Sequence, residues 1–258
     1  MGVDTMQTLF GAGALWGTPL TDSQGNAISN PTPVRFGVAQ EISIDIDFST
    51  KELYGTLQFP VAIGRGTAKI SGNIKNAQIN GRAWASLFFG QPQSAGIFAD
   101  VLDTIGELIP ATGPYTITPT VPSSGTWVAD LGVLDTNGNP MVVVASSPAA
   151  GQYSVSAGTY TFAAADEGKK VFINFQYTAT STTVQNQVIT SQPLGYTPTF
   201  SLDVFLPYNG ASVTAHLYNV VASKLAIQTK LDDFVIPQMD YSAFADAQNR
   251  VMQISTTQ

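Results

Sequence analysis

The clearest pattern in the chain is a strict alternation of apolar and polar residues over positions 42–48. The apolar positions hold isoleucine or phenylalanine, and the polar positions hold serine or aspartate. A period of two predicts a strand with one face buried and one face in water. The alternation returns over 67–75, where small or apolar residues separate threonine, lysine, serine and asparagine. Together the two segments predict an antiparallel pair with one apolar and one polar face.

The connection between these two strands, residues 50–65, is itself rich in large apolar side chains. We expect it to form a loop or an extended hairpin tip. An exposed loop of this composition is typical of an association site, because such a surface gains from being covered. The sequence therefore predicts subunit-interface residues here, namely Leu53, Tyr54, Leu57 and Phe59.

Residues 1–33 predict an N-terminal arm, because glycine and proline recur too often for a long regular element. Three large side chains in this segment have no obvious burial site within it. We expect them to pack on their own domain or on a neighbouring subunit, and they are candidate interface residues: Phe10, Leu15 and Trp16. The glycines do not have the spacing of a dinucleotide-binding fingerprint.

A single short helix is predicted over 82–89. Asn80 is a candidate N-cap and Gly90 a candidate C-cap. Trp84, Leu87 and Phe88 are spaced to form one apolar stripe, which we expect to lie on the apolar face of the sheet.

The remaining patterns predict a mainly-β chain in which a small antiparallel β module, 114–194, is inserted into a domain made of 34–113 and 195–258. Residues 97–109 are compatible with a second short helix or with irregular structure. Short apolar runs separated by glycine, asparagine and proline predict the strands. Those of the module are 127–134, 141–145, 153–156, 159–163 and 170–179. Those of the second half of the main domain are 200–206, 212–221, 230–237 and 250–255.

Charge is scarce. Asp, Glu, Lys and Arg make up 11% of the chain, against about 25% in an average protein. This favours a surface covered by neighbouring subunits, whose interfaces are depleted in charge; a neutral polar surface is the alternative. The net charge of −7 argues against a protein that binds nucleic acid tightly.

The chain has no cysteine, so disulfides and thiolate metal sites are excluded. No apolar run approaches the ~20 residues of a membrane helix, so we expect no membrane partner.

No pattern predicts catalysis, a cofactor or a metal site. His216 is the only histidine and lies in a predicted strand without a nucleophile-elbow motif, so we interpret it as structural. Asp45 and Asp47 share a strand face, and a solvated face explains them better than a glycosidase pair. The segment 135–139 begins like a calcium loop, but its glycine is misplaced and no closing glutamate follows. A hairpin turn at Asn137 explains it better.

Taken together, several segments resemble the tail tube (major tail) proteins of tailed bacteriophages. The first are Leu-Tyr-Gly at 53–55, Gln-Phe-Pro-Val at 58–61 and Gly-Thr-Ala-Lys-Ile-Ser-Gly at 66–72. In the module they are Asp-Leu-Gly-Val at 130–133, Gly-Gln-Tyr-Ser-Val at 151–155, Gly-Thr-Tyr-Thr-Phe-Ala-Ala at 158–164 and Phe-Gln-Tyr-Thr-Ala at 175–179. Leu-Asp-Asp-Phe-Val-Ile-Pro at 231–237 and Ala-Phe-Ala-Asp at 243–246 complete the set. The resemblance covers most of the chain and consists of structural residues.

The resemblance implies a tail-tube-type β-sandwich or partly closed barrel with one flanking helix. Six copies would form a ring, and stacked rings would form the tail tube of a virion, assembled in the host cytoplasm. Implied partners are identical copies, other tail proteins (tape measure, terminator, baseplate or tip), and double-stranded DNA that passes without specific binding.

The channel should then be polar and on balance acidic. Our candidate lumen-facing residues are Asp45, Asp47, Thr67, Lys69, Ser71 and Asn73. The alternatives are another virion subunit, such as a capsid decoration or baseplate protein, and, less favoured, a carbohydrate-binding module or glycosidase.

Overall fold

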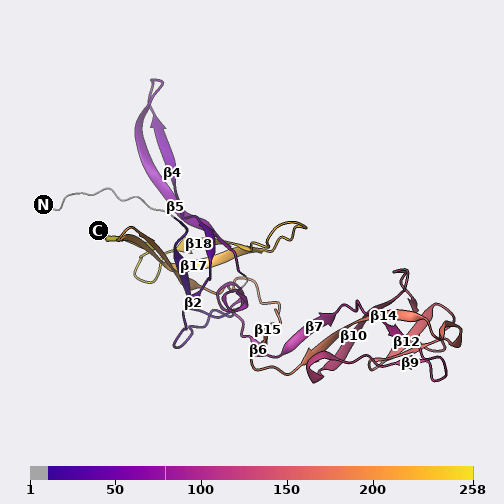
Figure 1. The fold of residues 1–258 in the computed structure, drawn as a ribbon. Coiled ribbons are helices and arrows are strands. Elements are labelled where there is room, and N and C mark those ends of the chain that lie inside the picture. The colour runs from indigo at the N-terminus through magenta and orange to yellow at the C-terminus, as the bar shows by residue number, and fades with distance from the viewer. Residues whose placement is uncertain (1–10, 79, 258) are drawn as a thin grey trace. The chain divides into compact units, whose positions relative to one another are not determined.

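The fold was analysed in a computed structural model, which describes residues 11–78 and 80–257. The protein is mainly β and divides into two compact units (Figure 1). Unit 1 consists of Met1–Gln93 and Gln187–Gln258, and unit 2 of Ser94–Asn186. The fold class expected from the alternating patterns is therefore confirmed.

Unit 1 is built on a nine-stranded antiparallel sheet in the order β2-β1-β16-β17-β18-β5-β3, with β19 added to β17 and β4 added to β5. No strand pairing in the described residues closes the sheet into a barrel. The tight turn between β16 and β17 uses Asn209 and Gly210, both at positive φ, as a two-residue hairpin turn requires. The bounds are β1 Ala14–Pro19, β2 Val34–Arg35, β3 Ala39–Ile42, β4 Asp45–Tyr54, β5 Pro60–Asn76, β16 Phe200–Tyr208, β17 Ala211–Ala226, β18 Gln238–Phe244 and β19 Met252–Thr257.

The predicted helix is confirmed and lies against this sheet. It begins as one α-helical turn, α1 (Gly81–Ala83), and continues as a π-helical turn, η1 (Trp84–Phe89). Gly90 ends it in the left-handed conformation, at φ 60°. Leu87 is fully buried in the core with Phe36 and Leu202. A Cβ at Gly17 of β1 would come within 2.4 Å of Leu87 Cδ1, so glycine permits the helix to approach the sheet.

We expect Asn80→Ala to lower the free energy of unfolding of unit 1 by about 1 kcal/mol. The Asn80 side chain accepts a hydrogen bond from Ala83 N at 3.2 Å and donates one to Arg35 O at 2.8 Å. Urea unfolding measures the loss. Asn80→Asp keeps the acceptor for Ala83 N but loses the donor to Arg35 O, so it should recover only part of the stability. No loss of stability in Asn80→Ala would contradict a role for these two bonds.

Unit 2 contains two larger sheets around its own core. One has the order β10-β14-β7, with β8 also paired to β14, and the other has the order β11-β12-β13-β9. The core includes Ile173 and Phe175 of β14, with Tyr160 of β13 facing them from the second sheet. The bounds are β6 Ser94–Ala95, β7 Ile97–Val101, β8 Glu107–Leu108, β9 Thr116–Ile117, η2 Pro122–Ser124, β10 Thr126–Asp135, β11 Val142–Val143, β12 Gln152–Ser156, β13 Thr159–Phe162, η3 Ala164–Asp166, β14 Lys170–Ala179 and β15 Gln185–Asn186, which pairs with β6.

The unit boundaries differ from the predicted insertion at 114–194. Unit 2 begins at Ser94 because β7 and β8 pair with β14. Residues 97–109 therefore form two strands and an Asp103-capped turn, and the alternative of a second helix was wrong.

In unit 1, the strand predicted at 230–237 was also wrong, since β18 starts only at Gln238. The five strands predicted for the module are all present, β11 in shortened form.

A hydrogen-bonded aromatic cluster joins the two sheets of unit 2. Tyr153 and Tyr160 both donate to the Asp130 carboxylate, and Trp127 Nε1 donates to the Tyr160 hydroxyl. Burial raises the pKa of both tyrosines, and the Asp130 carboxylate raises the pKa of each further. The fold therefore favours the protonated phenols.

We expect unit 2 to lose stability as pH rises above about 10. Since the pKa values of Tyr153 and Tyr160 are raised on folding, their contribution is complete below the unfolded tyrosine pKa of about 10 and falls above it. Urea unfolding at a series of alkaline pH values measures this loss. The control is the Tyr153→Phe/Tyr160→Phe variant, whose unfolding should depend less on pH; an unchanged dependence would contradict the assignment.

Candidate assembly surface

The β4–β5 hairpin projects from the rest of unit 1 (Figure 1). Its ladder is continuous from the pair Asp45 and Ser71 to the pair Tyr54 and Pro60, with register shifts near Ser49 and at the tip. The segment predicted as a loop or extended hairpin tip, 50–65, is thus an extended hairpin, and only 55–59 lie outside the strands. Every residue of β4 is exposed, as are those of β5 from Val61 to Lys69.

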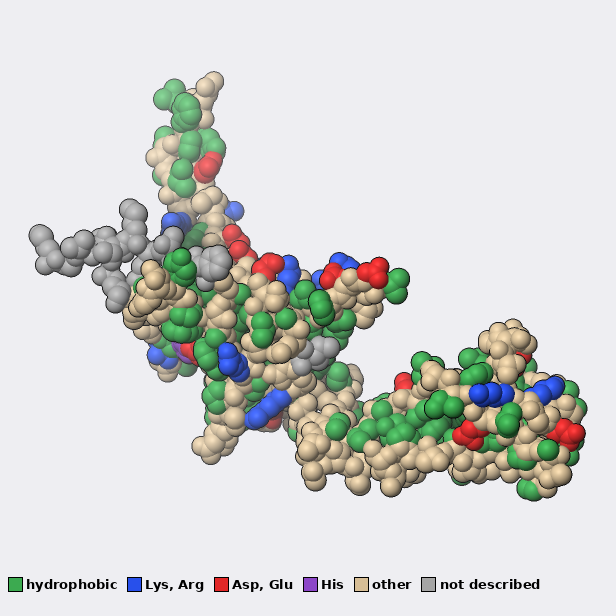
Figure 2. Space-filling view, in the orientation of Figure 1, with side chains coloured by type: hydrophobic (Ala, Val, Ile, Leu, Met, Phe, Trp, Pro, Cys, Tyr) green, Lys and Arg blue, Asp and Glu red, His purple; other side chains and the backbone are tan. Residues whose placement is uncertain are grey.

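The outer half of the hairpin is apolar and without charge. No charged residue occurs between Glu52 and Arg65. Leu57 is 79% exposed and Phe59 81% exposed. Hydrophobic side chains gather on the outer part of the hairpin, whereas charged side chains lie nearer its base (Figure 2). Its exposed large apolar residues are Ile46, Phe48, Leu53, Tyr54, Leu57, Phe59, Val61 and Ile63.

The size of this apolar surface indicates an interface. At roughly 150–250 Å² for a large side chain, the fractions exposed here leave on the order of 1,000 Å² of apolar area in water. The largest apolar patch of a soluble monomer is usually about 300–600 Å². A standard protein interface buries about 800 Å² on each partner. These side chains lie on both faces of the hairpin, since Ile63 pairs with Glu52 and Leu53 with the neighbouring Ala62, so the apolar area is divided between the two faces. The hairpin therefore offers apolar surface to partners on either side.

The opposite face of the hairpin is polar and brings together most of the candidate lumen residues. Asp45 lies across from Ser71, and Asp47 lies across from Lys69. Thr67 and Ser49 share a hydrogen bond of 3.1 Å. The sixth candidate, Asn73, lies nearer the body, where its backbone N and Nδ2 both donate to Ser43 Oγ. Lys75 forms an ion pair with Glu41 of the same chain at 2.7 Å.

The structure corrects the expectation that the apolar face of this strand pair is buried. Ile42 and Ile44 pack against the core of unit 1, as predicted. Further along the strand, Ile46 is 45% and Phe48 46% exposed, because this part of the hairpin extends beyond the core of unit 1. The Arg65 guanidinium lies over the Phe48 ring at 4.5 Å, a cation–π contact that covers part of it.

Two of the three candidate interface residues of the predicted arm can be placed. Leu15 is fully buried within unit 1, so its assignment to a subunit interface was wrong. It belongs to β1, which pairs with β16 and β2 and is an integral strand of the sheet. Trp16 is half-buried and lies 6.0 Å from the Arg35 guanidinium. Phe10 lies outside the described residues.

Two further apolar segments in unit 1 were missed by the sequence analysis. Leu231 and Phe234, in the connection between β17 and β18, are 98% and 88% exposed. Leu194 and Tyr196, in the segment before β16, are also exposed. The sequence pattern that could have identified these exposed segments is the one seen in the hairpin: large apolar residues among glycine, proline and polar residues. The first segment falls in the strand predicted at 230–237, where such residues were expected to be buried.

The other candidate sites are explained by local structure. His216 Nδ1 lies 2.6 Å from Asp203 Oδ1 on the neighbouring strand, and its ring contacts Tyr218 edge-on. No group of three or more acidic, histidine or cysteine side chains that could hold a metal ion occurs in residues 11–78 and 80–257. Nor does any helix in those ranges have the length and apolar character needed to cross a membrane.

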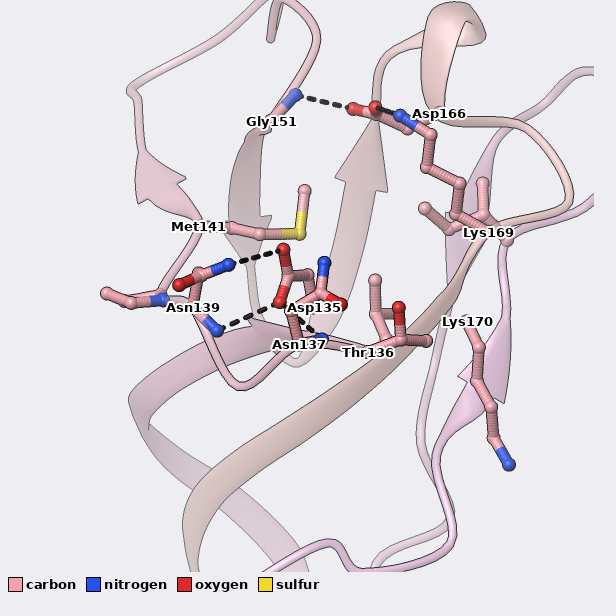
Figure 3. A pocket seen from close by; sticks show the side chains of 12 residues that line it. Asp135, Thr136, Asn137, Asn139, Met141, Gly151, Asp166, Lys169 and Lys170 are labelled. Atoms are coloured by element: carbon pink, nitrogen blue, oxygen red, sulfur yellow. Dashed lines mark hydrogen bonds and ion pairs between the residues drawn. The ribbon is translucent and has the colours of Figure 1, made fainter.

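A cavity of about 490 Å³ in unit 2 is lined by groups that are already bonded (Figure 3). Asp166 is almost fully buried; its carboxylate accepts from Gly151 N at 2.8 Å and from Lys169 Nζ at 2.7 Å. Asp135 accepts from the backbone N of Asn137 and of Asn139, both at 2.8 Å. The hydrogen bond from Asn139 N is the main reason that the pKa of Asp135 is lowered. The predicted hairpin turn at 135–139 is thus present, and both carboxylates stabilise loops.

Comparison with known proteins gives no family for this chain: no protein-family model matches it, and no curated protein matches it significantly. Function is therefore inferred from the exposed surface of the β4–β5 hairpin.

Proposed function

We propose that this protein is a virion structural protein whose copies assemble into stacked hexameric rings, forming the tail tube through which phage DNA passes. The observation that carries the proposal is the β4–β5 hairpin, whose outer part, 53–64, has no charge and whose exposed large apolar side chains together leave on the order of 1,000 Å² in water. Exposed apolar surface of this extent marks an interaction site, and identical copies are the partners always present. The resemblance of the sequence to tail tube proteins supports the same assembly.

Passage of DNA requires a wall that does not bind phosphates. The polar face of β4–β5 places Asp45 and Asp47 side by side on exposed positions of one strand. Lys69 stands opposite Asp47 and offsets one of these charges, while Lys75 is already paired with Glu41. Screening limits such charges to a range of about 8 Å at physiological salt. Lys51 is exposed on the same face of β4, so the two acids are matched by Lys51 and Lys69, and this face is close to neutral. It would neither repel DNA strongly nor offer a cluster of cations to hold it.

Negative-stain electron microscopy of the purified full-length protein tests the proposal. Tubes or rings with an open centre are the expected result. Closed or irregular assemblies would favour a capsid decoration or baseplate subunit. Single dispersed particles at high concentration would contradict any role based on self-assembly.

A further inference from the structure

The β10-β14-β7 sheet of unit 2 has one face toward the core of the unit and one face outward. Val171, Ile173 and Phe175 of β14 face the core, so the residues that alternate with them point to the outer face. Every residue of unit 2 is described, so the exposed fractions on this face already include all that the unit itself can place over it.

This outer face is apolar, although the exposed face of an antiparallel sheet is usually polar. Leu102, directly after β7, is 76% exposed. Val128 and Leu131 lie at the two register shifts of β10 and are 43% and 48% exposed. The exposed large apolar side chains of the face are Phe98, Leu102, Leu108, Val128 and Leu131.

The apolar area of this face matches one side of a stable interface. At roughly 150–250 Å² for a large side chain, the exposed fractions leave on the order of 500 Å² in water. A standard interface buries about 800 Å² on each partner, of which somewhat more than half, roughly 450 Å², is apolar. The face can therefore supply the apolar part of such an interface by itself.

A lysine and an aspartate lie at opposite ends of this face. Lys170 begins β14, and Asp100 of β7 stands beside Gln176, six residues further along β14. That spacing is about 20 Å, so the two charges cannot meet within one chain. Neither forms an ion pair among the residues that the structure describes. Asp103, the acid nearest Lys170 in the pKa pattern of this turn, is already held by three backbone N–H groups.

These positions make the face complementary to itself. If two such faces pack with their strands antiparallel, Lys170 of each copy lies over Gln176 of the other and therefore next to its Asp100. Packed sheets lie about 10 Å apart, a distance that a lysine and an aspartate side chain span together. One two-fold axis then produces two ion pairs around an apolar centre.

We propose that unit 2 pairs with unit 2 of a second copy through this sheet face, with the strands of the two faces antiparallel. The pairing does not involve the β4–β5 hairpin and goes beyond the function proposed above. Because the same surface is used on both sides, the contact is closed and joins two copies only.

Cross-linking of the full-length wild-type protein with a carbodiimide tests the pairing, because this reagent joins a lysine to a carboxylate only where the two touch. Isotope-labelled and unlabelled chains are mixed before assembly, so that mass spectrometry recognises a cross-link between copies by its one labelled and one unlabelled peptide. Mixed cross-links from Lys170 to Glu167, an exposed acid outside the sheet face, measure random collisions.

We expect a mixed cross-link between Lys170 and Asp100 well above the Glu167 background. Leu131→Lys should reduce it to that background, because a charge at this central position would be buried without a partner. Val143→Lys, on the other sheet of unit 2 and 56% exposed at that position, should leave it unchanged. If circular dichroism shows that Leu131→Lys does not fold, Leu102→Lys replaces it under the same criteria.

A wild-type cross-link no stronger than the background, or one that Leu131→Lys leaves intact, would overturn the pairing. Tubes without this cross-link would overturn the pairing and leave the proposed function standing. The cross-link without rings or tubes in the microscopy would overturn the proposed function and leave the pairing standing.

Discussion

Replacing both tip residues with lysine, as Leu57→Lys/Phe59→Lys, is expected to abolish assembly while leaving the subunit folded. The fold should be unaffected because both side chains are about four-fifths exposed and lie outside the core of unit 1. Assembly should fail because each lysine buried without a partner costs at least about 3 kcal/mol, or 100-fold or more in the association constant. Circular dichroism measures the fold, and electron microscopy measures assembly.

The matched control for this variant is Ala247→Lys/Gln248→Lys, which adds the same charge at an exposed turn of unit 1. This control should assemble as the wild type does. Normal tubes from the tip variant would show that the hairpin is not an interface. Loss of assembly in both variants would show that added charge, rather than its position, is responsible.

Phe175→Ala is expected to destabilise unit 2 by about 3–5 kcal/mol without affecting unit 1. Phe175 is almost fully buried in the core of unit 2, and this core shares no residue with the core of unit 1. The loss is a large part of the ~5–15 kcal/mol that stabilises a typical domain. Hydrogen exchange measured on peptides should show faster exchange within 94–186 and unchanged exchange in β16 and β17.

Phe98→Ala is the matched control, because Phe98 belongs to the same unit but is 57% exposed. Its effect should stay within about 0.5 kcal/mol. Equal acceleration of exchange in both units after Phe175→Ala would contradict two independent cores.

The strands that the sequence predicted well are those whose alternation coincides with burial. In β14, Val171, Ile173, Phe175 and Tyr177 face the core in strict alternation, and its observed bounds equal the predicted range. The helix was equally predictable, because Asn80 and Gly90 have the local chemistry of caps.

The errors arose where burial depends on distant parts of the chain. Alternation in β4 predicts a buried face, but whether a core lies beneath Phe48 depends on how far the hairpin extends from the sheet. Leu15 occurs among glycines, and its burial depends on pairing with β16, far along the chain. In 230–237, Leu231 and Phe234 are three residues apart, which does not fit one face of a strand.

The central claim is that the exposed apolar surfaces of this subunit are covered by identical copies. Sedimentation velocity of the wild-type protein over a series of concentrations tests it most directly. The account predicts species much larger than the 27.2 kDa chain, with their share rising with concentration. A single monomeric species at every concentration, with Leu57 and Phe59 still in water, would contradict it.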